Sequence, residues 1–183
     1  MKNINLILIF FALICTSCLG EKENDKVKEA NNATKETVKK TIGIDAIKEQ
    51  LCSNFPKELV LGYHPDANRI EIEPVDNGSG GTLHCDIKLF YGKKEYEFWK
   101  GHVYAHINQQ EDPFWQYNPE RNAMLYHRVE MGDKAVFISN MYQLQILKEG
   151  VLYGITPPNN GNTTSSGKLT KEIALEIAQH YKL

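Results

Sequence analysis

Between residues 69 and 156 the chain repeats short segments in which apolar and polar residues alternate, the pattern of half-buried β-strands. In the clearest segment, Leu83, Cys85, Ile87 and Leu89 fall on one face and His84, Asp86 and Lys88 on the other. Further strands are predicted over 69–73, 95–107 (with a bulge at Lys100-Gly101), 124–130, 135–139, 142–148 and 151–156. Turn-forming pairs such as Gly132-Asp133 and Glu149-Gly150 separate these strands, so we expect antiparallel hairpins.

Two helices are predicted to flank the strands. Ile44, Ile47 and Leu51 have the spacing of a short amphipathic helix that ends at Cys52. Near the C-terminus, Thr170 is predicted to cap a helix whose buried stripe is Ile173, Ile177 and Tyr181. A short helix, six or seven antiparallel strands and a terminal helix predict an α+β fold, with a single domain over 42–183.

The N-terminal segment has the layout of a secretory signal peptide. Lys2 precedes an apolar run over 4–14, and Thr16-Ser17-Cys18 closes the run with a cysteine where cleavage is expected. The run is shorter than the roughly 20 residues that a bilayer span needs. An ordinary secreted protein and an uncleaved N-terminal anchor remain alternatives. Residues 18–41 are polar and nearly free of large apolar side chains, which predicts a flexible tether.

The end of this segment resembles the lipobox of bacterial lipoproteins, in which the cysteine is acylated and becomes the new N-terminus. Cys15 departs from the pattern, because it stands where leucine is usual. The resemblance implies that residues 1–17 are a lipoprotein signal peptide and that Cys18 carries palmitate-type acyl chains. It implies a location on a membrane of the bacterial cell envelope, most readily the outer membrane. It does not distinguish the periplasmic side from the cell surface.

Loss of the signal peptide and acylation of Cys18 would leave Cys52 and Cys85. Outside the cytoplasm such a pair is expected to form a disulfide, with two buried thiols as the alternative. The chain-entropy model gives a closed loop of this size a stabilisation of roughly 3.5–4 kcal/mol.

A second resemblance covers residues 44–183. A cysteine that ends the first helix, another within a strand, Gly132-Asp133-Lys134-Ala135-Val136 before a hairpin, and the strand motif Leu144-Gln145-Ile146 are similar to the PsbP-like α/β sandwich of small bacterial lipoproteins. The resemblance implies an extracytoplasmic domain, often of unknown function, to which no catalytic residues are carried over.

Four aromatic residues are the candidate binding surface: Trp99, Phe114, Trp115 and Tyr117. Flat aromatic side chains stack on apolar faces of sugars and peptides, and three of these lie in an irregular segment over 108–122 where strand packing does not explain them. Tyr126 belongs to the same set. Ordinary core and loop packing is the alternative explanation.

His102 and His106 have the spacing of a helical metal site, but they alternate with Val103, Ala105 and Ile107 as in a strand. On a strand they share a face with Tyr104 yet lie about 13 Å apart, too far for one ion. No phosphate-binding loop or nucleophile elbow is present. We therefore predict no enzyme, no cofactor and no metal site.

The leading interpretation is a lipid-anchored, non-catalytic lipoprotein that binds an envelope protein, peptide or glycan. A formal net charge of −2 without a clustered basic face argues against nucleic acid as partner. The alternative is an envelope enzyme or metal-dependent protein with a pocket formed by histidines and carboxylates: His102, His106 or His127 with Glu97 or Glu130. A purely structural component of the envelope is a third possibility.

Overall fold

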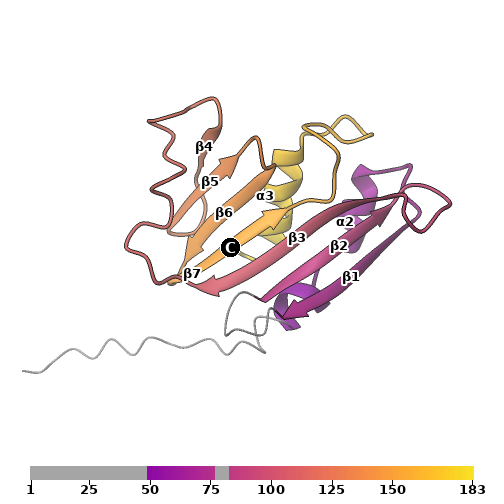
Figure 1. Ribbon diagram of the computed structural model, residues 1–183, viewed down its shortest axis with the longest axis horizontal. Helices are drawn as coiled ribbons and strands as arrows, with labels where there is room; N and C mark the ends of the chain where they lie inside the picture. Colours follow the sequence, from indigo (N-terminus) through magenta and orange to yellow (C-terminus); the bar gives the residue numbers. More distant parts are fainter. Residues whose placement is uncertain (1–48, 77–82) are drawn as a thin grey trace, which may run out of the picture. The chain divides into compact units, whose positions relative to one another are not determined.

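Seven strands form one antiparallel sheet in the computed structural model, which describes residues 49–76 and 83–183 (Figure 1). The strands are β1 (Arg69–Asp76), β2 (Leu83–Phe90), β3 (Phe98–Ile107), β4 (Tyr126–Val129), β5 (Lys134–Ile138), β6 (Gln143–Lys148) and β7 (Val151–Thr156). Their order across the sheet is β1-β2-β3-β7-β6-β5-β4. The predicted α+β fold is confirmed, and β1 and β4 are the two edges.

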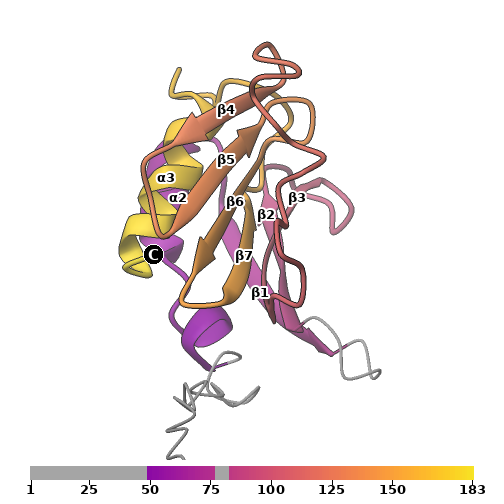
Figure 2. The ribbon, with the colours of Figure 1, turned by 90° about the vertical axis from the view of Figure 1, so that its left-hand side faces the viewer.

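The helices of the described chain cover one face of the sheet, as Figure 2 shows for α2 and α3. A single π-helical turn, η1 (Glu49–Ser53), and α2 (Lys57–Tyr63) pack against the β1–β3 half. The C-terminal helix α3 (Thr170–His180) packs on β6 and β7. The apolar face of each strand is therefore turned toward the helices.

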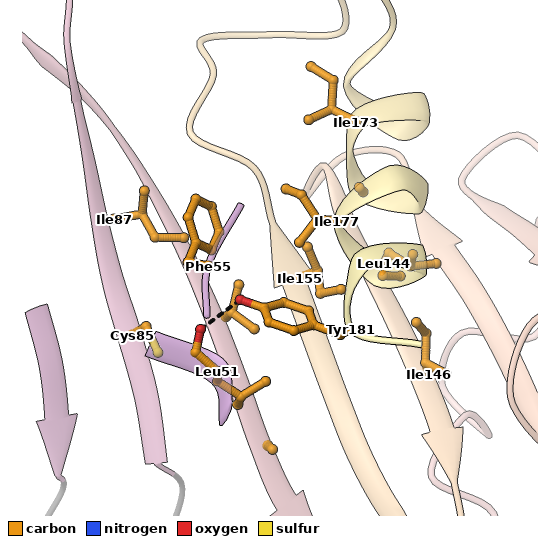
Figure 3. Close-up of a cluster of buried hydrophobic side chains, with 14 of the residues drawn as sticks. Leu51, Phe55, Cys85, Ile87, Leu144, Ile146, Ile155, Ile173, Ile177 and Tyr181 are labelled. Atoms are coloured by element: carbon orange, nitrogen blue, oxygen red, sulfur yellow. Dashed lines mark hydrogen bonds between the residues drawn. The ribbon is translucent and has the colours of Figure 1, made fainter. Parts of the chain in front are cut away.

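The main core lies between this face and the helices (Figure 3). Ile173 and Ile177 of α3 are fully buried and meet Leu144, Ile146 and Ile155 of the sheet. Each such side chain contributes roughly 1.5–3 kcal/mol relative to its exposed state. The hydroxyl of Tyr181 donates a hydrogen bond of 2.7 Å to the carbonyl oxygen of Leu51, which ties the C-terminal end of the chain to η1.

The sulfur atoms of Cys52 and Cys85 lie at disulfide distance, 1.99 Å apart, with their Cα atoms separated by 5.4 Å. Cys52 lies one residue before the end of η1, close to the predicted helix end, and Cys85 lies in β2, as the sequence predicted. The pair sits on the helix-covered face, where Cys85 is buried in the main core. The cross-link would therefore hold η1 against the sheet.

Four local predictions are wrong in detail. The strand predicted from residue 95 begins at Phe98, because the Tyr91 N–H donates to the Glu97 carbonyl at 3.1 Å and closes a loop before it. The bulge predicted at Lys100-Gly101 in the same strand is also wrong, because β3 pairs with β2 in continuous register through both residues. The helix α2 was not predicted, since Pro56 and Gly62 suggested breaks. Pro56 instead precedes the first helical residue, where its missing N–H costs nothing.

The fourth difference concerns the start of α3. The N-cap is Leu169, whose N–H donates to the Glu172 carboxylate at 3.1 Å. Thr170 is the first helical residue and is buried, and its hydroxyl donates to the carbonyl oxygen of Gly161. Thr170 therefore anchors the preceding loop to the helix and does not cap it.

The N-terminal predictions lie outside the described residues. These are the signal peptide over 1–17, the acylation site Cys18, the tether over 18–41 and the helical residues 44–48. Among the residues that the structure describes, no helix is long and apolar enough to cross a membrane.

Candidate binding pocket beside the β4–β5 hairpin

The loop between β3 and β4 crosses the open face of the sheet, on which no helix of residues 49–76 and 83–183 packs. Its anchor is Phe114, which is buried in a small apolar cluster with Val136, Ile138 and Leu152. The Tyr117 ring lies edge-on to the Tyr126 ring, with 5.7 Å between the ring centroids. The aromatic residues of this loop were predicted to form a binding surface, and two of them are what fastens the loop to the sheet.

Side chains of the loop fix its local shape. The Asp112 carboxylate accepts hydrogen bonds from the Phe114 N–H at 3.0 Å and from the Lys134 ammonium at 2.9 Å. These bonds hold the pKa of the Asp112 carboxyl below its ordinary value. Asn118 accepts from the Glu120 N–H at 2.9 Å and so closes the next turn. The loop is therefore tied to the start of β5 at one point and folded by its own side chains elsewhere.

A pocket of about 430 Å³ lies between this loop and the β4–β5 hairpin. That volume is within the range of small-ligand sites. The loop contributes Phe114 and Tyr117, and the hairpin contributes residues 128–136. Six charged residues line the pocket: Asp112, Glu120, Arg128, Glu130, Asp133 and Lys134. Four are acidic and two are basic, so the lining carries a formal charge of −2 beside apolar walls.

The two basic residues of the pocket differ in their partners. Lys134 is paired with Asp112, and its ammonium lies 5.4 Å from the Phe114 ring centroid. Arg128 is exposed and, with the residues that the structure describes, forms no ion pair. Its guanidinium is therefore available to a ligand in the pocket.

A polar stripe runs beside the pocket on the same face of the sheet. His102, Tyr104 and His106 stack along β3, with centroid distances of 6.0 and 5.9 Å between successive rings. The Tyr104 ring occupies space over β7 that only glycine leaves open, because a Cβ at Gly154 would lie 2.1 Å from it. Burial, with a smaller contribution from Tyr117, raises the pKa of Tyr104 to about 12.

Two buried glutamines of β6 connect the stripe. The Gln145 amide donates to Gln143 at 2.9 Å and to the Tyr104 hydroxyl at 3.3 Å. The Gln143 amide lies 3.1 Å from both His102 Nε2 and Thr156 Oγ1. Burial, with the neighbouring His84, lowers the pKa of His102 against the opposing effect of Asp86. His102 and Tyr104 therefore belong to one hydrogen-bonded network, whereas His106 Nδ1 has no partner among the described residues.

The structure divides the predicted aromatic surface. Phe114 and Tyr117 line the pocket, and Trp115 lies in the same loop with 54% of its surface exposed. Trp99 is on the helix-covered face, where it packs against the main core and lies 5.0 Å from the buried His64 ring. Phe114, Trp115 and Tyr117 therefore belong to one region, and Trp99 belongs to another.

The histidines and carboxylates of the metal-dependent alternative are also separated. His102 and His106 lie on the open face, whereas the His127 ring packs on Phe137 of the main core and bonds to Ser139 at 2.7 Å. Glu97 accepts a hydrogen bond within its own loop, and Glu130 lines the pocket. Across residues 49–76 and 83–183, no three histidine, cysteine or acidic side chains are grouped to hold a metal ion.

Sequence reasoning missed the charged side of the pocket. The strand predicted over 124–130 already placed Tyr126, Arg128 and Glu130 on one face, because residues two apart share a face. The strand pattern therefore predicted that these three side chains share a face, but it did not predict that the β3–β4 loop lies opposite them.

No family model matches the chain, and the comparisons with curated proteins and with solved structures find no significant match. The resemblances to the lipobox and to the PsbP-like sandwich therefore stay predictions.

Proposed function

We propose that the protein is a lipid-anchored, non-catalytic binding lipoprotein of the bacterial cell envelope, and that the pocket beside the β4–β5 hairpin is its binding site. The single observation that supports the site best is the pocket itself, because it combines aromatic side chains with an arginine that has no ion partner among the described residues. Such a combination of apolar walls and a few oriented polar groups is typical of ligand sites.

The proposed partner is an envelope protein, peptide or glycan. Apolar surface beside Phe114 and Tyr117 suits an aliphatic side chain or a sugar face, and the charged rim suits polar groups on either. The polar tether predicted over 18–41 would let the domain search a layer close to the membrane. The proposed location is the outer membrane, with the periplasmic and surface sides as alternatives.

The binding site is tested by photo-crosslinking in intact cells of the source organism. The full-length chain carries a benzophenone amino acid at Trp115, which is exposed and lies in the chain between the pocket residues Phe114 and Tyr117. The control carries it at Tyr96, which is 70% exposed in the loop before β3. We expect a discrete adduct at position 115 and none at position 96. Absence of any adduct at position 115 would contradict the proposed site.

The membrane anchor is tested separately with Cys18→Ala. The variant should lose fatty-acid labelling and leave the membrane fraction, because several acyl chains hold a protein on a bilayer and each buried methylene contributes about 0.8 kcal/mol. A Cys15→Ala control should stay acylated and membrane-bound. A Cys18→Ala protein that remains as firmly bound as the parent would disprove the lipoprotein prediction.

A further inference from the structure

The two edges of the sheet differ in how easily a further strand could pair with them. The edge strand β1 contains Pro74. It also carries three charged residues on the open face of the sheet: Arg69, Glu71 and Glu73. Proline and charges on an edge are features that prevent strand addition. The opposite edge, β4, is short and carries one charged residue, Arg128, but it contains no proline, and in the described chain its only strand neighbour is β5. The β4 edge is therefore the more open of the two.

The hydrogen-bond phase of β4 follows from its first bond to β5. The Ser139 N–H donates to the Leu125 carbonyl at 2.8 Å, immediately before Tyr126 pairs with Ile138. In antiparallel pairs, hydrogen-bonded and non-bonded positions alternate. His127 and Val129 therefore direct their backbone groups toward β5, and Arg128 directs its N–H and C=O away from the sheet.

One backbone group on the outward side of β4 is already hydrogen-bonded within the chain. The Tyr126 N–H also points outward, but it donates to the Asn122 carbonyl at 2.9 Å and is not free. An added strand could bond to both backbone groups of Arg128, to the Tyr126 carbonyl and to the Glu130 N–H. Because these are few bonds, side-chain contacts must supply much of the affinity.

Side chains along the same edge point toward the pocket. Arg128 and Glu130 line it, and Tyr126 packs against Tyr117 at its side. Residues directly opposite each other on neighbouring strands have their side chains on the same face, about 5 Å apart. A residue of an added strand that lies opposite Arg128 would therefore reach the pocket, as would the residues two positions before and after it.

We infer that β4 binds an extended peptide as an antiparallel eighth strand whose side chains enter the pocket. From N- to C-terminus, the peptide places a basic residue opposite Glu130, an acidic residue opposite Arg128 and an aromatic or aliphatic residue opposite Tyr126. The inference rests on the proposed function, and it commits the partner class to a peptide segment of a protein. The charge order follows from the opposite signs of Arg128 and Glu130 along one edge.

The probe is an acetylated, amidated nonapeptide with lysine, glutamate and tyrosine at positions three, five and seven and threonine elsewhere. Its affinity for the full-length chain in detergent is measured by calorimetric titration. We expect a dissociation constant between roughly 10 μM and 1 mM, because a short ladder gives a weak complex. No binding at about 1 mM, the weak end of that range, would overturn the inference.

A pair of protein variants isolates the backbone contribution. Arg128→Pro removes an N–H that points away from β5, so the ladder to β5 and the fold are expected to survive. Arg128→Ala removes the same side chain and keeps the N–H. We expect Arg128→Pro to bind the nonapeptide roughly tenfold more weakly than Arg128→Ala, with both unfolding at similar urea concentrations. Equal affinities of two folded variants would overturn the strand addition.

Two altered peptides test the same contacts without touching the protein. N-methylation of the central glutamate removes the N–H that would bond to the Arg128 carbonyl, and should weaken binding roughly tenfold. Exchange of the lysine and glutamate places like charges opposite each other and should weaken binding several-fold. An N-methylated peptide that binds as well as the parent would overturn the strand addition, whatever the variants do.

These outcomes separate the inference from the proposed function. An adduct at position 115 in cells, together with no binding of the nonapeptide, leaves the binding site standing and removes the strand addition. An adduct that carries only carbohydrate does the same. Absence of any adduct at position 115 counts against the proposed site itself.

Discussion

The two faces of the sheet differ in the side chains that they bury. On the helix-covered face of the described chain, nineteen buried residues form one continuous cluster, nearly all of them apolar. On the open face, the buried apolar cluster formed by the described residues has four members, and the neighbouring positions of β3 and β6 carry histidine, tyrosine and glutamine. Buried polar side chains stabilise a fold less than apolar packing does and demand complete hydrogen bonding. The comparison predicts that most of the stability resides on the first face, and the binding site proposed above lies on the second.

The largest effect is expected from the cysteine pair on the helix-covered face. Replacement of both cysteines in the variant Cys52→Ala/Cys85→Ala should lower the free energy of unfolding by about 4 kcal/mol, because the unfolded chain gains the entropy of an open loop. Urea unfolding of the variant and the parent, each with and without a reducing agent, measures the difference. A parent that loses no stability on reduction would show that the cross-link does not hold η1 to the sheet.

Matched truncations compare the two faces directly. Ile177→Ala removes a fully buried side chain from the centre of the main core and should cost about 2–5 kcal/mol of unfolding free energy. Leu152→Ala removes a side chain from the small cluster, where the loop over β7 can collapse, and should cost about 2 kcal/mol. Urea titrations of both variants test this order. If Leu152→Ala lost more unfolding free energy than Ile177→Ala, packing on the open face would contribute more to stability than the account predicts.

One buried and two partly buried histidines should make the unfolding free energy fall in mild acid. Burial lowers the pKa of His64, His102 and His106, with Asp66 opposing the effect at His64 and Asp86 at His102. Below the unfolded pKa of about 6.5, the unfolded chain binds protons that the folded chain resists. The unfolding free energy should therefore be highest above pH 7 and decrease as the pH falls from about 6.5 toward the folded pKa values.

His64 should dominate this dependence. It is 1% exposed, and neither ring nitrogen has a hydrogen-bond partner among the described residues. His102 Nε2, in contrast, bonds to Gln143 and Thr156. Urea unfolding between pH 8 and pH 5, about the range in which histidine titrates, should show a weaker dependence for His64→Leu than for His102→Gln. The reverse order would place the acid-sensitive group on the open face.

The smallest effect on stability is expected at the rim of the pocket. Trp115→Ala removes a side chain that is mostly exposed, so its unfolding free energy should stay within about 0.5 kcal/mol of the parent. A larger loss of unfolding free energy, measured in urea, would indicate that the Trp115 side chain packs against the rest of the domain. Trp99→Ala is the matched control, because the same truncation on the helix-covered face removes contacts with the main core and with His64.

Much of the fold could be predicted because alternation is a local signal. The strands from β1 to β7 and the buried stripe of α3 follow directly from residues two or four apart. The start of β3 and the role of Thr170 were predicted wrongly, since both depend on partners outside the segment. Glu97 bonds back to Tyr91, and Thr170 bonds to Gly161.

The site was predictable only in part for the same reason. The irregular loop with Phe114 and Tyr117 was recognisable from its aromatic residues, and the pocket lies beside it. The sequence did not show that Trp99 lies on the other face of the sheet from Phe114 and Tyr117. The alternation along a strand says which residues share a face, but not which face the loop covers. Arg128 and Glu130 look like ordinary exposed residues of a strand until the loop is placed opposite them.

The most direct test of an open recognition edge is amide hydrogen exchange across β4 in the free protein, measured residue by residue by NMR. The Arg128 amide should exchange quickly, whereas the amides of His127 and Val129, which bond to β5, should be protected. Addition of the nonapeptide should protect Arg128 selectively. An Arg128 amide that is already as protected as His127 in the free protein would show that the edge of β4 is closed and that the proposed strand addition is wrong.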